Sequence, residues 1–536
     1  MTSIDPTVVA AARMPVAEYP KIAPFHPDSR YPEYRGATGT ETNRVYESVR
    51  ESFRLLGMDA ANYGLPQWNP MRNVVRPGDR VVIKPNLLAH AHGSKPEEWL
   101  QVITHGSVVR AVADYVALAL KGEGEITVMD GPQYDSDWDQ IISRSGLGEV
   151  IRHCASTAGV PVRLLDLRDY QMEVRGEVIY RRVKLPSDPL GGVAIDLGSK
   201  SALTNHNGAG KYFGSDYDQS ETNHHHSGGR HEYRISRTAA SADVFINVPK
   251  LKTHKKVGVT LCMKNLVGIN VGRNWLPHHT DGDPSTGGDQ FPAPSVKSTV
   301  ERSAIRWMQQ QTLQVAGMHH VYRLAKSWGK HIFGRTDQVV RHGNWSGNDT
   351  CWRMVLDINR CLMYGDGQTF PLPSAKRFFA VVDGVIGGDG DGPACPDPYP
   401  AGVIIAGYNP VAVDCSAARL MGFDPSRVPQ LAHAFDPHSM ALADFPYDAI
   451  RLVSNERAWS GSLEGLAPGS TFHFRPHFGW VGQIEDTDHH GGRVAAFALR
   501  SKADPDYQKT EVGDSALESR SNGSKSSRGT FRRSSQ

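Results

Sequence analysis

The sequence predicts an α/β protein with a mostly parallel, doubly wound sheet, interrupted by long loop and helical insertions. Short apolar runs rich in β-branched residues recur along the chain, and most of them end at a proline, a glycine or a polar residue. A helical pattern separates the first two runs, as in βαβ units, whose strands pair in parallel. With 53 glycines and 34 prolines in 536 residues, the chain is also expected to have long connections.

The first βαβ unit is predicted after a proline-rich arm, residues 1–40. Residues 41–56 place apolar side chains at helical spacing, which predicts a helix. Residues 80–86 are a β-branched run ended by a proline, which predicts a strand. A helix over 104–119 and a second strand over 125–130 complete the unit.

Three further strands are predicted from later apolar runs, at residues 243–249, 378–383 and 402–407. A helix is expected to begin near Asn409 and Pro410, because Asn caps helices and Pro suits their first turn. Four or more strands in this rhythm indicate an open sheet with helices on both faces.

Two insertions rich in Gly, His, Asp and Asn interrupt the alternation of strands and helices. The second contains an amphipathic helical pattern at 303–328. The last segment is basic and almost free of large apolar residues, so we expect it to be disordered. The predicted organisation is a proline-rich arm (1–40), an α/β domain (41–455) with insertions at 155–240 and 270–375, a C-terminal extension (456–500) and a disordered basic tail (501–536).

The composition predicts a soluble, cytoplasmic protein with no membrane span. The 59 Lys and Arg nearly balance the 57 Asp and Glu, so the net charge of +2 does not indicate a specific nucleic-acid partner. No window approaches the roughly 20 consecutive apolar residues of a membrane-spanning helix. Residues 1–24 lack the apolar core of a signal peptide. A homo-oligomer is compatible with these features.

The six cysteines show no CxxC pairing and no spacing typical of a zinc ribbon or a ferredoxin cluster. We therefore expect reduced thiols and no intrinsic iron–sulfur cluster.

Polar residues follow the predicted strands at the points where the strands end. In open α/β sheets ligands bind beyond the carboxyl ends of the strands, so these positions are candidates for a site. Taken singly, each is better explained as a solvated residue at a strand end, whereas the set as a whole favours a site. The residues are Lys84, Asn86, Asp130, Asn247, Lys250, Lys252, His254 and Asp383.

Residues 249–256 place four lysines and a histidine in eight positions, and Lys264 and Asn265 follow shortly after. A cluster of cations suits phosphate or carboxylate oxygens. Alternation along an extended chain would put Lys250 and Lys252 on one face, although a plain charged loop is the alternative.

Residues 383–393 form an Asp-Gly-rich segment, expected to be a loop, in which Asp383, Asp389 and Asp391 lie among five glycines. Carboxylate oxygens on a closely approaching backbone suit a hard divalent cation, and we predict Mg²⁺ or Mn²⁺. The alternative is a tight turn whose carboxylates accept hydrogen bonds from their own backbone amides.

Two other features raise hypotheses about single residues. Asp414 falls inside an apolar helical pattern and needs a partner, for which Lys264 or Lys84 would serve. Consecutive histidines in polar loops are more often solvated than bound to a metal. Among the histidines of the insertions, only His278 or His279 is retained as a candidate metal ligand.

Several of these segments are similar to the ordered motifs of the domain of unknown function family 362. They are residues 82–87, 249–254, 263–266, 383–387 with 390–393, and the helix 414–422. Members of that family are often joined to a ferredoxin-like module that carries iron–sulfur clusters. This chain lacks the cysteine spacing of such a module, so the redox role that the resemblance implies would need a separate carrier.

The preferred hypothesis is a metal-assisted enzyme that acts on a small anionic metabolite, phosphorylated or carboxylated. Its alternatives are a non-catalytic accessory protein that binds a metabolite or cofactor, and a redox protein partnered with a separate iron–sulfur carrier. The assigned roles are catalysis for His254, Lys264 and Lys84, substrate binding for Asn86, Lys250, Lys252, Asn265 and Asp130, and metal binding for Asp383, Asp389 and Asp391.

Overall fold

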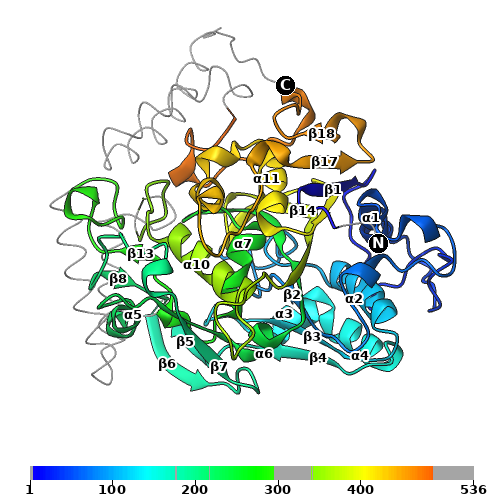
Figure 1. Cartoon of the computed structure of the whole chain (residues 1–536), viewed down its shortest axis with the longest axis horizontal. Helices are drawn as coiled ribbons and strands as arrows, with labels where there is room; N and C mark the ends of the chain where they lie inside the picture. The colour runs from blue at the N-terminus through cyan, green and yellow to red at the C-terminus, as the bar shows by residue number, and fades with distance from the viewer. Residues whose placement is uncertain (1–3, 176–177, 216–217, 295–339, 341, 487–536) are drawn as a thin grey trace, which may run out of the picture.

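The computed structural model describes residues 4–175, 178–215, 218–294, 340 and 342–486 (Figure 1). A 12-stranded sheet forms the centre, and its main path runs β18-β17-β1-β16-β14-β10-β2-β3-β4. Strands β14, β10, β2, β3 and β4 are parallel to one another, whereas β16 is antiparallel to both β14 and β1. The prediction of a mostly parallel α/β sheet is confirmed.

The strands of the sheet are β1 (Val8–Arg13), β2 (Arg80–Pro85), β3 (Glu125–Asp130), β4 (Val162–Asp166), β10 (Val244–Val248), β11 (Lys250–His254), β12 (Gly258–Val259), β14 (Arg377–Asp391), β15 (Cys395–Tyr399), β16 (Val403–Gly407), β17 (Arg451–Ser454) and β18 (Gly461–Ser462). The helices are α1 (Arg44–Leu55), α2 (Gly106–Leu120), α3 (Trp138–Ser145), α4 (Leu147–Thr157), α5 (Gln219–His225), α6 (Arg237–Ser241), α7 (Leu261–Asn265), α10 (Cys351–Met363), α11 (Pro410–Met421) and α12 (Pro429–Ala432). No helix of the described ranges combines the length and apolar character needed to cross a bilayer.

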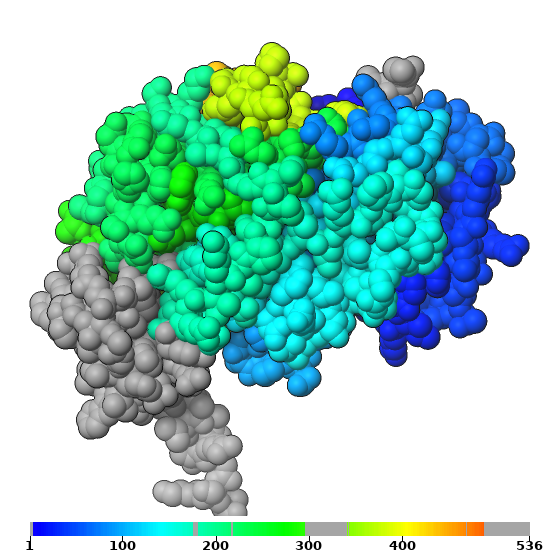
Figure 2. All heavy atoms as spheres, turned by 90° about the horizontal axis from the view of Figure 1, so that it is seen from below, coloured from blue at the N-terminus to red at the C-terminus, as the bar shows by residue number. Residues whose placement is uncertain are grey.

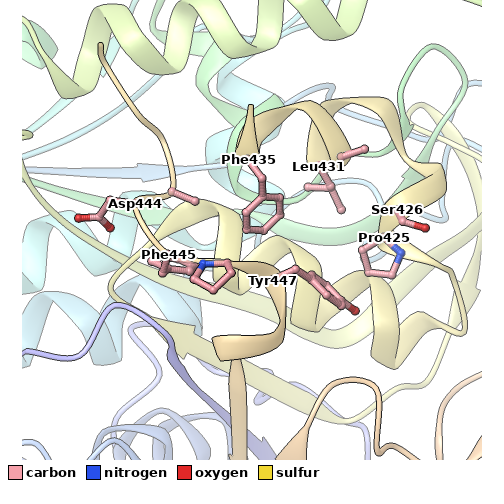
Figure 3. A pocket seen from close by; sticks show the side chains of 10 residues that line it. Pro425, Ser426, Leu431, Phe435, Asp444, Phe445 and Tyr447 are labelled. Atoms are coloured by element: carbon pink, nitrogen blue, oxygen red, sulfur yellow. The ribbon is translucent and has the colours of Figure 1, made fainter. Parts of the chain in front are cut away.

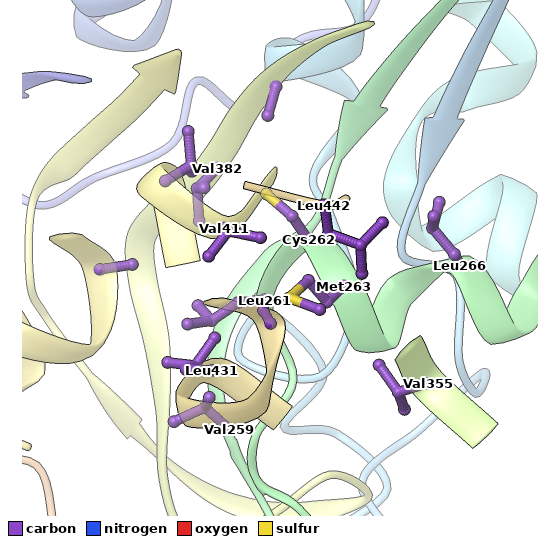
Figure 4. Close-up of a cluster of buried hydrophobic side chains, with 14 of the residues drawn as sticks. Val259, Leu261, Cys262, Met263, Leu266, Val355, Val382, Val411, Leu431 and Leu442 are labelled. Atoms are coloured by element: carbon purple, nitrogen blue, oxygen red, sulfur yellow. The ribbon is translucent and has the colours of Figure 1, made fainter. Parts of the chain in front are cut away.

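Both faces of the sheet are buried, in two separate apolar cores. Along β2, Val81 and Ile83 belong to one core and Val82 to the other, because successive side chains of a strand point to opposite faces. Helices α1 and α2 cover the first face. On the second face, α7, α10 and α11 pack into a core that includes Met263, Val355, Val382 and Val411 (Figure 4). This core fixes α7, the helix that carries Lys264.

The N-terminal arm contributes a strand that the sequence analysis did not anticipate. Residues 8–13 form β1, which lies between β16 and β17 in the central sheet. Its run Val8–Ala12 is short and rich in alanine, so it gives little local signal for a strand. Pairing with β16 and β17, far along the chain, determines its conformation.

The Asp-Gly-rich segment is a strand rather than a loop, which corrects the expectation from its glycines. β14 continues to Asp391, and its last five residues pair with β15 in antiparallel register. The backbone hydrogen bonds of β15 satisfy this stretch, and such a partner cannot be recognised from glycine content.

The described parts of the two insertions contain three small two-stranded sheets and the helix α10. In the view from below, the green surface of the later part of these insertions lies beside the cyan surface of the chain that precedes it (Figure 2). The pairs are β5 (Tyr170–Arg175) with β6 (Val178–Lys184), β7 (Gly192–Asp196) with β9 (Glu232–Ser236), and β8 (Tyr212–Phe213) with β13 (His279–Thr280). The predicted amphipathic helix at 303–328 and the basic tail lie outside the described residues.

Candidate functional site

Lys84 and Asp130 form a fully enclosed ion pair at the carboxyl ends of the parallel strands β2 and β3. Lys84 Nζ lies 2.7 Å from Asp130 Oδ1. The other carboxylate oxygen accepts a hydrogen bond from the backbone N–H of Leu87 at 2.6 Å. Burial lowers the pKa of Lys84, and the charge of Asp130 partly opposes this effect. The adjacent backbone of Gly268 leaves no room for a Cβ, which would overlap Asp130 Oδ1 and lie 2.9 Å from Lys84 Nζ.

Lys250 and Asp383 form a second buried pair, at the start of β11 and within β14. Lys250 Nζ lies 3.1 Å from Asp383 Oδ2 and donates to the Tyr19 hydroxyl at 2.6 Å. Tyr19 in turn donates to Asp383 Oδ1 at 2.6 Å, and the backbone N–H of His105 donates to Asp383 Oδ2 at 2.9 Å. Burial lowers the pKa of Lys250, and Asp383 opposes this effect. The N-terminal arm thus contributes Tyr19, whose hydroxyl is hydrogen-bonded to both members of the pair.

Lys252 is affected by the charges of both pairs but has no carboxylate of its own. Its Nζ donates to the backbone oxygen of Val102 at 2.5 Å and to Asn86 Oδ1 at 3.2 Å. Burial and the charge of Lys250 hold the pKa of Lys252 well below its usual range. β11 is a buried strand, so the alternative of a plain charged loop is wrong for Lys250 and Lys252.

Lys264 and Arg273 are cations that form no ion pair with any residue that the structure describes, although the charges of Asp130 and Asp166 act on Arg273 from a longer distance. Lys264 is 7% exposed, and none of these residues makes a hydrogen bond or ion pair with its Nζ. Arg273 is half-buried, its Nε is enclosed without a hydrogen-bond partner, and its guanidinium lies 5.5 Å from the centre of the Tyr134 ring. Burial lowers the pKa of both groups. We call Lys252, Lys256, Lys264 and Arg273, with His254 and His278, the cationic cluster.

The histidines of the cluster are neutral near pH 7. Burial holds the pKa of His254 and of His278 well below the usual range, and the charge of Lys264 adds to the effect in both. His254 Nδ1 accepts the backbone N–H of Lys256 at 3.0 Å, so the proton of the neutral ring lies on Nε2. Burial lowers the pKa of Lys256 to about 8.

Asn265 and Asp414 position α7 beside the cluster. Asn265 accepts a hydrogen bond from Lys84 Nζ at 3.1 Å and donates to Asn247 Oδ1 at 2.7 Å. Asp414 does not pair with Lys264 or Lys84, which corrects that expectation. Its two oxygens accept the backbone N–H groups of Cys262 and Met263, at 2.7 and 2.8 Å, because the first turn of a helix leaves these donors free. Burial raises the pKa of Asp414 to about 7.

The three predicted metal ligands have other partners. Asp383 belongs to the Lys250 pair, and Asp389 forms an ion pair with Arg475 at 2.7 Å. Asp391 accepts the backbone N–H of Phe478 at 3.4 Å. Within the described residues, no three His, Cys, Asp or Glu side chains are grouped so that they could hold a metal ion. Mg²⁺ or Mn²⁺ binding by these carboxylates stays a prediction, and it would require Asp383 and Asp389 to exchange Lys250 and Arg475 for the ion.

The structure thus brings the predicted residues of β2, β3, β11 and α7 together and leaves Asp389 and Asp391 with Arg475 and Phe478. Reasoning from the sequence missed Arg273 and Tyr19. Arg273 comes from the second insertion and Tyr19 from the N-terminal arm, both outside the strand ends that drew attention. His279 stacks on Phe213 with ring centres 4.6 Å apart, and neither of its ring nitrogens has a hydrogen-bond partner among the described residues.

Fold and site together define a mixed α/β protein with a polar cluster at the carboxyl ends of its parallel strands. The chain belongs to the family described as domain of unknown function (DUF362), which it matches over residues 81–191 and 187–419. It is 30% identical over 203 residues to a thylakoid-associated protein of Synechocystis sp., and the match covers 38% of this chain and 43% of that protein. The chain therefore spans less than half the length of this relative.

The closed pair of Lys250 and Asp383 gives a prediction about stability. Replacing Lys250 with Met leaves a buried carboxylate without its cation, so we expect the free energy of unfolding to fall by about 3–5 kcal/mol. Urea denaturation measures the change. The double variant Lys250→Met/Asp383→Asn is the control and recovers part of the loss, because it removes the orphaned charge as well. An unchanged stability in Lys250→Met would contradict the pair.

Proposed function

We propose that the protein is an enzyme that binds a small phosphorylated or carboxylated metabolite at the cationic cluster. One observation carries the proposal: Lys264 is buried and Arg273 is half-buried, and neither forms an ion pair with a described residue. Burying an unpaired charge is costly, and a bound anion offsets that cost. Guanidinium and ammonium groups are the usual donors to phosphate and carboxylate oxygens.

The states of the titratable groups support roles in catalysis. The neutral His254 carries its proton on Nε2 and can donate a hydrogen bond to negative charge that develops on a substrate oxygen. Burial lowers the pKa of Lys264, so that its ammonium group can give up a proton to the bound substrate closer to neutral pH. Lys84 and Asn265 share a hydrogen bond, which would hold α7 and its Lys264 in place against the substrate. The groups around the substrate are held in position by the buried contacts of Lys250, Lys252, Asn86 and Asp130.

A divalent cation at Asp383, Asp389 and Asp391 remains part of the proposal. A metal-free accessory protein that binds the same anion is the second candidate. The partners of Asp383 and Asp389 favour it, because Lys250 and Arg475 already neutralise these carboxylates. A redox protein served by a separate iron–sulfur carrier stays open as a third.

We further propose that the protein works in the cytoplasm on a small-molecule ligand, rather than on nucleic acid, and that it forms a homo-oligomer. The lack of a membrane-crossing helix among the described residues supports a location in solution. The name of the Synechocystis relative associates that protein with thylakoids, so fractionation of cells is the direct test of location.

A ligand panel tests the proposed function. We expect phosphate monoesters or small carboxylates, with or without Mg²⁺ or Mn²⁺, to raise the melting temperature of the whole protein, because a ligand that binds only the folded state stabilises it. Lys256 is charged below its pKa of about 8 and neutral above it. Anion affinity is therefore expected to fall between pH 7 and pH 9, as measured by calorimetric titration.

The panel also separates the alternatives. Stabilisation that requires the metal supports the metal-assisted enzyme, whereas stabilisation by the anion alone supports the accessory protein. If no anion of either class stabilises the protein at low ionic strength, the cationic cluster is not a binding site.

A further inference from the structure

An apolar surface pocket, which shares no residue with the cationic cluster, lies between α12 and the chain that follows it. Its volume is about 640 Å³. The ring of Phe435 lies at its centre, 6.4 Å from the ring of Phe445 and 6.1 Å from that of Tyr447, with Leu431 beside it (Figure 3). We call this the Phe435 pocket, and it is lined by Pro425, Ser426, Leu431, Ala432, Phe435, Ala443, Asp444, Phe445, Pro446 and Tyr447.

The lining of the Phe435 pocket is suited to an apolar occupant. Phe435, Phe445 and Tyr447 are each only half-buried, although each is a large side chain that gains from complete burial. Contiguous exposed apolar surface of this kind usually marks a place where another chain segment docks. Asp444 is exposed at the rim and has no cationic partner among the described residues.

The described chain ends beside this pocket. The backbone N–H of Asp424, the residue before Pro425, donates to the oxygen of Ile484 at 2.8 Å. Phe423 and Glu485 form an antiparallel bridge, and Asp486 is ion-paired with Arg419. Whatever follows Asp486 therefore starts within a few residues of the pocket lining.

The sequence after Asp486 contains one apolar run, Val494 to Leu499, bounded by Arg493 and Arg500. Residues 487–494 can span about 26 Å when extended at roughly 3.3 Å per residue, which reaches the pocket from its nearest edge. The apolar side chains of the run can pack against the half-buried rings of the pocket. The flanking arginines carry the charge opposite to that of Asp444. Tethering also keeps the local concentration of the segment high.

We propose that residues 493–500 of the same chain occupy the Phe435 pocket, with Phe497 among the aromatic rings and a flanking arginine beside Asp444. This interaction is independent of the proposed function. It gives the C-terminal extension a fixed place on the α/β domain.

Cysteine cross-linking in the full-length protein tests this docking. In a Cys395→Ser background, Ala443→Cys in the pocket is combined with either Ala496→Cys inside the apolar run or Ala503→Cys just beyond it. A free tether anchored at Asp486 predicts only about a twofold difference in the rate of disulfide formation, from the two loop lengths. Docking predicts a rate at least tenfold higher for the Ala496→Cys pair in a glutathione redox buffer.

Matched aspartate variants identify the anchor. Phe497→Asp is expected to reduce the rate of the Ala443–Ala496 cysteine pair to that of the free tether, whereas Phe531→Asp, farther along the same chain, leaves it unchanged. Equal rates for the two cysteine pairs overturn the proposal. A disulfide-linked dimer as the main product, joined between positions 443 and 496, also overturns it and assigns the pocket to a second copy of the chain.

Discussion

Replacing Gly268 with Ala is expected to lower the free energy of unfolding by about 3–5 kcal/mol, the cost of breaking a buried ion pair. Gly268 lies in the turn after α7, where a Cβ would overlap Asp130 Oδ1 and crowd Lys84 Nζ. The backbone oxygen of Gly268 also accepts the N–H of Gly131 at 2.9 Å, so the turn cannot simply move away. Urea denaturation of the two proteins measures the difference.

Gly469→Ala is the matched control, because nothing lies within 4 Å of a Cβ at that position and its backbone needs no positive φ. Its stability should stay within about 0.5 kcal/mol of the parent protein, as for surface substitutions in general. If Gly268→Ala is as stable as Gly469→Ala, then the close contact at the Lys84 pair is not a constraint on the fold.

Replacing Lys264 with Met is expected to weaken binding of the anionic ligand by about 10- to 100-fold. A charged hydrogen bond contributes about 1.5–3 kcal/mol, and each 1.4 kcal/mol is a factor of ten in affinity. The ligand-free protein should keep its stability or gain some, because the variant removes a buried charge that no described residue neutralises. Calorimetric titration and urea denaturation measure the two quantities.

The comparison with Lys250 makes this prediction specific. Lys250→Met is expected to destabilise the free protein, because it leaves Asp383 unpaired, whereas Lys264→Met is not. Lys200→Met, at an exposed lysine, controls for the loss of one positive charge and should change neither quantity appreciably. A loss of 3 kcal/mol or more in Lys264→Met would mean that Lys264 is a structural lysine rather than a ligand contact.

The strands that carry the candidate site could be predicted from the sequence because their signals are local. A run such as residues 80–86 is β-branched, alternates between two faces and ends at a proline, and these features need no knowledge of the rest of the chain. The structure has β2 at Arg80–Pro85 and β3 at Glu125–Asp130, close to the expected bounds. Because parallel strands end at one edge of the sheet, Lys84 and Asp130 could be expected to meet there.

Charge partners could not be predicted, because they depend on contacts between segments far apart in the chain. Asp383 pairs with Lys250 and with Tyr19 from the N-terminal arm, although its neighbours suggested a metal site. Asp414 accepts backbone N–H groups of α7 rather than a lysine. In each case the partner of the carboxylate depends on which hydrogen-bond donors lose contact with water when the chain folds.

The sequence by itself determined the α/β class, the family and the polar residues at the ends of the strands, since alternation and turn residues act over a few positions. Only the tertiary structure decided which cations are neutralised. It paired Lys84 and Lys250 with carboxylates and left Lys264 and Arg273 without one among the described residues. The physical reason is desolvation, because burying a charge is costly unless an opposite charge lies beside it, and the fold alone determines which residues become neighbours.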